Sequence, residues 1–259
     1  MRRILTAAER LIVAADFRPL DGLQPPIDQQ GPHLRWWVRN QVLALADSLK
    51  GTGVCLKVNS ALRACGYDLI DEIHARGLRV FADLKLIDIG ETLSTDGVYL
   101  REAKPELLTV MCVSGVGAMR SLKIKLPDTE VLGVTVLTSL KNEDTKAMFV
   151  CSAEEAVMRL TRIAAGMTDA KIDGFVSAGT EAAMLRGEFG ELFTLNTPAI
   201  RPKWAAVKGD DQNKKRSMTA AEAILAGADR IVVGRPIVQA ENPYDAVMRT
   251  IEEIASAIS

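Results

Sequence analysis

The sequence predicts an α/β protein, a (β/α)8 TIM barrel formed by a single domain over residues 1–259. Eight short β-rich runs recur along the chain, with helical patterns between them. This alternation indicates a parallel sheet, and eight repeats indicate that the sheet closes. The length of 259 residues also agrees with the about 250 residues typical of this fold. An open doubly wound sheet is the alternative, but no Gly-x-Gly-x-x-Gly segment follows the first run.

The predicted strands are short runs rich in β-branched and other apolar residues. In chain order they are residues 11–15, 54–58, 79–84, 107–112, 131–137, 173–177, 192–196 and 230–233. Helices are predicted between them, most clearly over residues 34–49, where apolar side chains recur at helical spacing. These side chains are Leu34, Trp37, Val38, Val42, Leu45 and Leu49.

Capping signals mark further helix ends. Ser152–Glu155 and Thr219–Glu222 have the spacing of capping boxes, and Asn242–Pro243 has that of an N-cap with a first-turn proline. Glycines stand where three helices are expected to stop. They are Gly77, Gly166 and Gly227.

Composition excludes several classes of protein. Apolar residues make up 48% of the chain and charged residues 25%, as in a globular protein with a full core. The net charge is −1, from 32 basic and 33 acidic residues, so neither a nucleic-acid partner nor a membrane partner is expected. No run of 18 apolar residues occurs, and the N-terminal apolar stretch is too short for a signal peptide.

Cysteines and histidines give no signal for a metal site or a crosslink. The four cysteines form no Cys-x-x-Cys pair and have no histidine at metal-ligand spacing, so reduced thiols in a cytoplasmic protein are expected. His33 and His74 fall in helical patterns, where ordinary surface or core roles are expected. The cysteines are Cys55, Cys65, Cys112 and Cys151.

Two long segments fall outside the repeating pattern. Residues 17–32 follow the first predicted strand, and residues 197–218 follow the seventh. Loops after the strands of a barrel lie on its catalytic face, and long ones are usually functional. We therefore expect both loops on the face that carries the site.

Charged residues gather where the predicted strands end. Asp83 and Lys85 are two residues apart, so a strand projects both from one face, and Asp88 follows in the next loop. Unpaired buried charge costs several kcal/mol. Convergence of these charges on one mouth of the barrel therefore favours a functional site over a structural salt-bridge network. The full set is Asp16, Lys57, Asp83, Lys85 and Asp88.

The eighth predicted strand ends in Gly234 and Arg235. A glycine lets the backbone approach a ligand, and arginine can donate two hydrogen bonds to phosphate. Barrels commonly bind phosphate at the loops after strands seven and eight, and the polar 197–218 loop, with Arg201 near its start, is interpreted as a lid. The alternatives are a turn glycine with a surface arginine, and a solvated charged loop.

These motifs, in this order and at this spacing, resemble the orotidine 5′-phosphate decarboxylase family over nearly the whole chain. The most specific element is D-x-K-x-x-D-I-x-x-T, matched by Asp83, Lys85, Asp88 and Thr92. The other matching segments are VAAD at 13–16, Lys57, VLTS at 136–139, TPAIRP at 197–202, GDDQ at 209–212 and GADRIVVGRP at 227–236.

The resemblance implies decarboxylation of orotidine 5′-phosphate to uridine 5′-phosphate and CO2 in de novo pyrimidine biosynthesis, with no cofactor and no metal. It implies ribose binding by Asp16 and Lys57, and a homodimer in which Asp88 reaches into the partner's site. The implied catalytic residues are Lys85, Asp83, Asp88 and Lys57. The implied substrate-binding residues are Asp16, Lys57, Asp83 and Thr92, then Thr138 and Ser139 for the pyrimidine, Arg201, and finally Gln212, Gly234 and Arg235 for the phosphate.

In this chemistry Lys85 is the expected proton donor. As an ammonium near C6 of the orotate ring it would stabilise the carbanion left by CO2 and then protonate it. Asp83 would keep Lys85 charged and repel the substrate carboxylate, by roughly 4 kcal/mol at about 4 Å with an effective dielectric near 20. No metal, pyridoxal or thiamine signal is visible in the sequence, so electrostatics are expected to carry the reaction.

Two other functions stay open. Mg²⁺-dependent enzymes of the same superfamily, such as 3-keto-gulonate 6-phosphate decarboxylase or the aldolase hexulose phosphate synthase, share D-x-K-x-x-D but carry an acidic residue where Lys57 stands. The second alternative is a catalytically silent phosphate-binding barrel. The chain also departs from the family pattern: Ala199 replaces a usual glycine, Cys112 replaces a frequent histidine, and the 17–32 loop is long. These departures are expected to affect loop movement more than chemistry.

Overall fold

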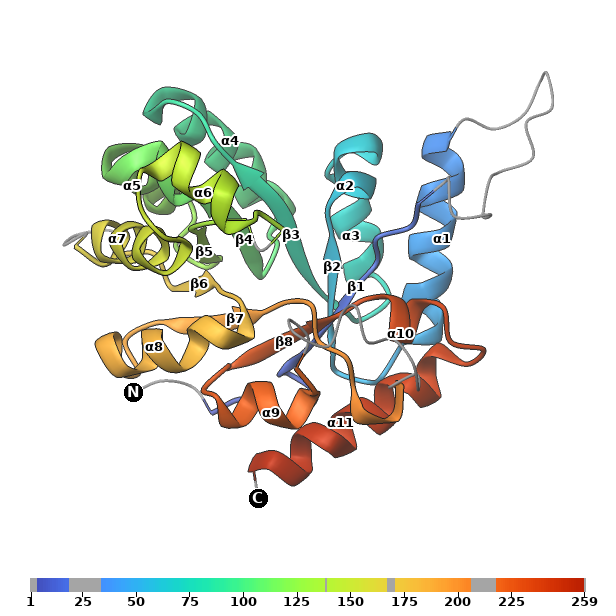
Figure 1. Cartoon of the computed structure of the whole chain (residues 1–259). Coiled ribbons are helices and arrows are strands. Elements are labelled where there is room, and N and C mark those ends of the chain that lie inside the picture. Colours follow the sequence, from blue (N-terminus) through green and yellow to red (C-terminus); the bar gives the residue numbers. More distant parts are fainter. Residues whose placement is uncertain (1–3, 19–33, 138, 167–170, 206–217, 259) are drawn as a thin grey trace.

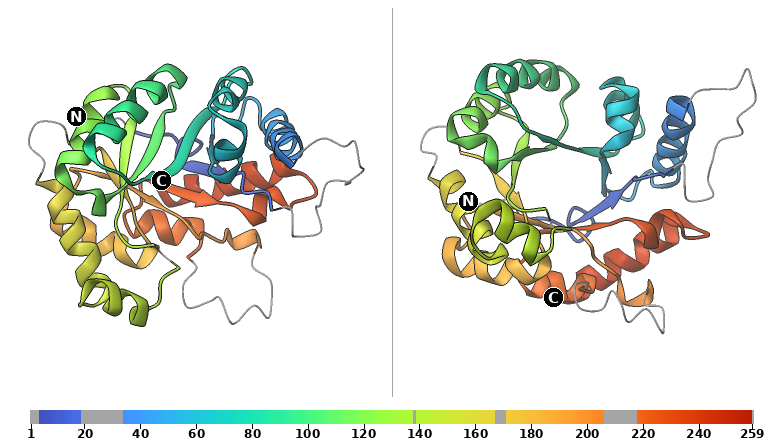
Figure 2. Two further views of the ribbon diagram at one scale, coloured as in Figure 1. Left: turned by 90° about the horizontal axis from the view of Figure 1, so that it is seen from above. Right: turned by 45° about the horizontal axis from the view of Figure 1, so that its top comes forward.

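The computed structural model describes residues 4–18, 34–137, 139–166, 171–205 and 218–258. Eight parallel strands form a closed barrel in chain order, with β8 pairing to β1. Helices surround the strands on the outside, as Figure 1 and the two further views in Figure 2 show. The predicted (β/α)8 TIM barrel is confirmed.

The strands lie close to the predicted runs. They are β1 (Leu11–Ala14), β2 (Cys55–Val58), β3 (Arg79–Leu86), β4 (Leu107–Met111), β5 (Glu130–Val134), β6 (Gly174–Val176), β7 (Thr194–Thr197) and β8 (Arg230–Val233). The largest differences are at β5, which ends three residues earlier than predicted, at β3, which continues two residues further, and at β7, which begins two residues later. The extension of β3 contains a bulge that shapes the site described below.

Helices and two 3₁₀ turns connect the strands. They are α1 (Leu34–Ser48), α2 (Ser60–Cys65), α3 (Asp68–His74), α4 (Gly90–Ala103), η1 (Cys112–Ser114), α5 (Gly115–Lys125), α6 (Asn142–Phe149), α7 (Ala153–Ala165), α8 (Gly179–Phe189), η2 (Lys203–Ala205), α9 (Ala220–Leu225), α10 (Arg235–Val238) and α11 (Pro243–Ile258). The apolar stripe of α1 is buried as predicted, except that Leu34, its first residue, is 54% exposed.

The predicted caps are present. The side-chain oxygens of Ser152 and Thr219 accept hydrogen bonds from backbone N–H groups three residues on, which opens α7 and α9. The side-chain carbonyl of Asn242 accepts from two N–H groups in the first turn of α11. Of the three stop glycines, Gly77 and Gly227 have positive φ, whereas Gly166 ends α7 in the right-handed region.

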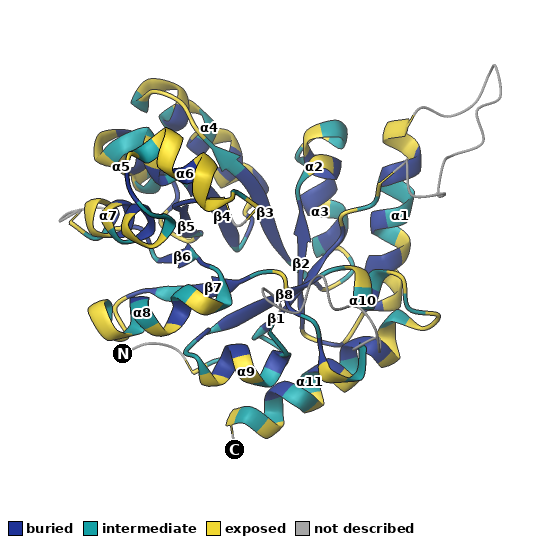
Figure 3. Ribbon diagram, in the orientation of Figure 1, coloured by how far each residue is buried: buried dark blue, intermediate teal, exposed yellow. Residues whose placement is uncertain are grey.

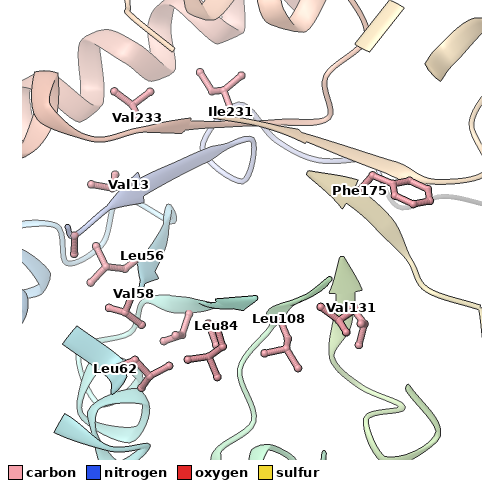
Figure 4. Close-up of a cluster of buried hydrophobic side chains, with 14 of the residues drawn as sticks. Val13, Leu56, Val58, Leu62, Leu84, Leu108, Val131, Phe175, Ile231 and Val233 are labelled. Atoms are coloured by element: carbon pink, nitrogen blue, oxygen red, sulfur yellow. The ribbon is translucent and has the colours of Figure 1, made fainter. Parts of the chain in front are cut away.

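The core has two layers, which follow from the alternation of side chains along the strands. An outer layer packs between strands and helices, and Figure 4 shows part of it, with ten side chains labelled, among them Val13 and Val233. Figure 3 shows the strands buried and the exposed residues gathered on the outer faces of helices. A smaller inner cluster fills the barrel itself. It consists of Ile12, Ala14, Cys55, Phe81, Leu107, Leu132 and Val232.

Paired charges close the amino-terminal end of the barrel. The Arg230 guanidinium, on β8, donates to both carboxylate oxygens of Glu130, on β5, at 2.9 and 2.8 Å. His74 lies 3.1 Å from Glu106 at this end, an ordinary structural role as predicted. A cavity of about 850 Å³ borders Glu106, Glu130 and Arg230. This end of TIM barrels serves stability and the opposite end serves activity, so the functional site is expected at the opposite end.

Candidate active site

A cavity of about 360 Å³ opens at the carboxyl ends of the strands. This volume suits a ligand the size of a nucleotide. The polar side chains of the cavity wall come mainly from the segments that end β1, β2, β3, β7 and β8, whereas the central strands supply valines. The charged and polar lining residues are Asp16, Arg18, Lys57, Asp83, Lys85, Arg201, Arg235 and Gln239.

Four of these side chains form a chain of alternating charge. Lys57 Nζ lies 2.9 Å from an oxygen of Asp16 and 3.3 Å from Asp83 Oδ2. Lys85 Nζ lies 2.7 Å from both oxygens of Asp83. The order Asp16, Lys57, Asp83, Lys85 thus places each charge beside one of opposite sign. Convergence was predicted for five residues: the contacts bring these four together, whereas Asp88 does not line the cavity.

The centre of this chain is buried and its ends face the cavity. Lys57 and Asp83 are each 7% exposed, while the side chains of Asp16 and Lys85 are 48% and 29% exposed. Removing one partner of a buried ion pair costs about 3–5 kcal/mol, because the other charge is left without compensation. The buried pair of Lys57 and Asp83 therefore fixes the position of Lys85, because Asp83 also bonds to the Lys85 ammonium. That ammonium stays accessible to a ligand.

Asp83 is held in its ionised form. Burial is the largest influence and works to raise the pKa of Asp83. The charges of Lys57 and Lys85 and the hydrogen bonds from Lys85 and Thr109 together outweigh burial, so the pKa lies below the ordinary value of 3.8. An ionised Asp83 forms an ion pair with Lys85, whose Nζ lies 2.7 Å away.

A bulge in β3 brings Asp83 and Lys85 to the mouth of the barrel. Ala82 pairs with Leu108 and Leu86 pairs with Val110, so residues 83–85 of β3 lie opposite Thr109 alone on β4. Lys85 has a φ of 48°, the left-handed region that non-glycine residues seldom adopt. The two-residue period of a regular strand predicted that Asp83 and Lys85 project from one face. In the structure, the bulge is what brings both side chains to that face.

Three residues that support the bulge and Asp83 were missed at the sequence level. Thr109 donates to Asp83 Oδ1 at 3.0 Å, and Asn59 Nδ2 donates to Asp83 Oδ2 at 3.4 Å. The guanidinium of Arg63, on α2, donates to the carbonyl of Leu84. The one sequence signal for any of the three was that Thr109 is polar inside the apolar run LLTVM. Threonine is so common in strands that this signal did not stand out.

The ends of β7 and β8 supply the residues predicted to bind phosphate. Gly234 and Arg235 both line the cavity, and Arg201 lines it from the loop after β7. The backbone N–H of Arg201 donates to the carbonyl of Met218 at 2.9 Å, which ties the start of the 197–218 loop to its end. Gln212, the other predicted phosphate ligand, lies outside the described residues.

A family model described as the Orotidine 5′-phosphate decarboxylase / HUMPS family matches residues 9–250, a range that contains all eight strands. The chain belongs to this family. The predicted membership is therefore confirmed.

Similar proteins agree with this family over most of their length. An orotidine 5′-phosphate decarboxylase of Alkalilimnicola ehrlichii is 36% identical over 253 residues, which covers 95% of this chain and 97% of the relative. One of Saccharophagus degradans is 36% identical over 221 residues, or 83% and 90% of the two chains. The crystal structure of orotidine 5′-phosphate decarboxylase from Lactobacillus acidophilus has a TM-score of 0.72 and 24% identity, covering 95% and 99%. At that identity the structural likeness supports the fold alone.

Two departures from the family pattern have structural counterparts. Ala199, where the resemblance leads us to expect glycine, has a φ of 64°, and a side chain in this left-handed region costs roughly 1–2 kcal/mol. Cys112 is 1% exposed and does not line the cavity. Burial raises the pKa of its thiol to about 12, so the thiol is neutral.

Other predicted site residues lie away from the cavity wall. Asp88 and Thr92 are exposed, one in the loop after β3 and the other in the first turn of α4. Ser139 is exposed and is not a cavity-lining residue, and Thr138 lies outside the described residues. The predicted substrate contacts of these four residues therefore stay predictions.

In the part of the chain that the structure describes, no group of three or more His, Cys, Asp or Glu side chains could hold a metal ion. Among the same residues, none of the helices is both long and apolar enough to cross a bilayer.

Proposed function

We propose that the protein decarboxylates orotidine 5′-phosphate to uridine 5′-phosphate and CO2, a step of de novo pyrimidine biosynthesis. The observation that carries this proposal is the chain Asp16, Lys57, Asp83, Lys85, which lines the same cavity as Gly234 and Arg235. A single cavity thereby offers an ammonium for a carbanion and a guanidinium for a phosphate. Membership of the family supports the same reaction.

In the proposed reaction the bond between C6 and the carboxylate breaks, and its electron pair stays on C6. CO2 leaves, and C6 takes a proton from the Lys85 ammonium, which later regains a proton from solvent. No atom needs an external oxidant or reductant. Lys85 suits both roles, because its ammonium is paired with Asp83 at 2.7 Å and remains partly exposed to the cavity.

Asp83 also acts on the substrate carboxylate. Two negative charges about 4 Å apart repel by roughly 4 kcal/mol at an effective dielectric near 20. This repulsion disappears as CO2 departs, so it raises the energy of the ground state relative to the transition state. Because the carboxylate of Asp83 is fixed by Lys57, Lys85 and Thr109, it cannot turn away from the substrate without losing those bonds.

The position of Lys57 argues against the Mg²⁺-dependent alternative. Its ammonium lies within hydrogen-bonding distance of both Asp16 and Asp83, so it already neutralises the two carboxylates that a divalent cation would need. A cation there would also be repelled by the lysine. The chemistry of this donor set therefore suits an ammonium and does not suit Mg²⁺.

Purified protein treated with EDTA is expected to convert orotidine 5′-phosphate to uridine 5′-phosphate with undiminished kcat, because the proposed reaction uses no metal. The loss of substrate absorbance gives the rate, and chromatography identifies the product. Activity that disappears in EDTA and returns with Mg²⁺, or turnover of 3-keto-gulonate 6-phosphate instead, contradicts the proposal. Tight binding of orotidine 5′-phosphate without turnover contradicts it too, and would favour the silent barrel.

We further propose that the active form is a homodimer with shared sites. Apolar side chains are exposed around Asp88, on the loop after β3, on α4 and near the start of α5, where a second copy could cover them. Asp88 stands beside this surface, and in its own subunit its carboxylate accepts the N–H of Ile89 and does not line the cavity. The exposed side chains are Ile87, Ile89, Val98, Tyr99, Val113 and Val116.

Mixing two inactive variants tests the shared site. Lys85→Ala and Asp88→Ala are each expected to lose activity, yet their heterodimer contains one site with neither lesion. After full subunit exchange half of the dimers are mixed and half of their sites are intact, so about a quarter of wild-type activity is expected. Mixing Lys85→Ala with Asp83→Ala is the matched control. Lys85 and Asp83 of any one site come from the same subunit, so each site of the mixed dimer keeps one lesion and no recovery is expected. Verified exchange without recovery in the first mixture overturns the shared site.

A cytoplasmic location is the last part of the proposal. All four cysteines are free, as is usual in a reducing compartment. Burial is the main cause that raises the pKa of the Cys55 thiol, to about 12, so this thiol is neutral and suited to packing inside the barrel.

A further inference from the structure

Thr109 sits at the centre of the charged site without lining the cavity. It lies in the middle of β4 and is 0% exposed. Its Oγ1 accepts a hydrogen bond from the backbone N–H of Lys85 at 2.8 Å and donates one to Asp83 Oδ1 at 3.0 Å. One hydroxyl therefore joins the backbone of the proposed proton donor to the carboxylate that pairs with its ammonium.

We infer that Thr109 is a positioning residue, which holds Lys85 and Asp83 in the geometry that decarboxylation requires. This inference rests on the proposed function for the chemistry, and on contacts within the chain for the positioning. Thr109 touches no substrate in this arrangement, so any effect on turnover must pass through Lys85 and Asp83.

The bulge in β3 explains why the hydroxyl is needed. Where residues 83–85 pass Thr109, the ladder between β3 and β4 is interrupted, so the N–H of Lys85 lacks a regular strand partner. A buried N–H without a partner is unfavourable. The hydroxyl of Thr109 supplies the missing acceptor, and it does so while Lys85 has a φ of 48°, a conformation that would otherwise be disfavoured.

The direction of the two hydrogen bonds is fixed by the chemistry. An ionised carboxylate only accepts, so the hydroxyl proton of Thr109 must point to Asp83. This leaves an oxygen lone pair for the N–H of Lys85. Asp83 is then held at Oδ1 by Thr109 and at Oδ2 by Lys57 at 3.3 Å, which restricts rotation of the carboxylate.

Thr109→Val tests the inference, because valine keeps the branched shape and removes the hydroxyl. Thr109→Ser restores the hydroxyl, and Thr161→Val is the matched control: Thr161 is also 0% exposed, but its hydroxyl donates to a carbonyl within α7. The measurements are kcat and KM for orotidine 5′-phosphate, the Tm, and the hydrogen-exchange rate of the Lys85 amide. If Thr109→Val does not fold, Thr109→Ala takes its place with the same expected changes.

Thr109→Val is expected to lower kcat by about 10- to 100-fold with KM within about threefold, since small misplacement of a reacting group affects turnover most. Exchange of the Lys85 amide should accelerate at least about tenfold, because its acceptor is gone. Thr109→Ser should restore kcat and the exchange rate of the Lys85 amide, and Thr161→Val should change neither of these two rates. Unaltered exchange in Thr109→Val, or a Thr109→Ser variant as impaired as Thr109→Val, overturns the inference. If the wild type does not decarboxylate orotidine 5′-phosphate, the proposed function fails, whereas the exchange rates still decide whether Thr109 positions Lys85.

Discussion

Lys85→Ala is expected to lower kcat for orotidine 5′-phosphate by at least about 10⁴-fold, since general acid catalysis and electrostatic stabilisation are lost together. Lys57 cannot take over, because it is 7% exposed and its ammonium is bonded to Asp16 and Asp83. Asp83 would then face the substrate carboxylate with one compensating cation fewer, which weakens binding of the reacting group further.

The loss must be separated from a folding defect. Tm and the affinity for uridine 5′-phosphate, which lacks the departing carboxylate, should change little in Lys85→Ala, because Lys57 and Thr109 still hold Asp83. Lys50→Ala is the matched control, since Lys50 is an exposed lysine paired with Asp47 on the outer helix layer. A Lys85→Ala variant with near-wild-type turnover would remove Lys85 from the mechanism.

Arg235→Ala is expected to lower kcat/KM for orotidine 5′-phosphate by about 2–3 kcal/mol of transition-state stabilisation, roughly 30- to 150-fold, through loss of a charge-assisted phosphate contact. The phosphate is remote from C6, but binding energy from a non-reacting group can be used at the reacting centre. Arg235 lines the cavity at the end of β8, and its backbone directly follows Gly234.

Orotidine without its phosphate shows how the arginine acts. This truncated substrate should react very poorly with the wild type and should be almost indifferent to Arg235→Ala, because the lost contact does not exist for it. Arg159→Ala, an exposed arginine on α7, should leave both substrates unaffected. Equal slowing of both substrates by Arg235→Ala would mean that Arg235 supports the barrel and does not bind phosphate.

The fold could be predicted from the sequence because its signals are local and repeated. Most strands of the barrel are short runs rich in apolar residues, and the strong caps at Ser152, Thr219 and Asn242 depend on residues three positions away or fewer. The convergence of Asp16, Lys57, Asp83 and Lys85 could also be predicted, since all four stand at carboxyl ends of strands that must meet at one edge.

What could not be predicted depends on contacts between distant segments. The bulge in β3 exists only relative to β4, and the role of Thr109 depends on that register. Arg63 supports the carbonyl of Leu84 from a helix 21 residues away. The proposed role of Asp88 in a neighbouring subunit's site came only from the family resemblance, because contacts between subunits leave no periodic pattern in the sequence.

A crystal structure of the protein with bound uridine 5′-phosphate tests the central claim most directly, namely that one cavity places the Lys85 ammonium at C6 and Arg235 at the phosphate. The expected result is Lys85 Nζ about 3–3.5 Å from C6, the separation of a near-attack geometry, with the Arg235 guanidinium hydrogen-bonded to phosphate oxygens and Lys57 still between Asp16 and Asp83. A nucleotide that binds with C6 remote from Lys85, or with its phosphate away from Arg235, would contradict it.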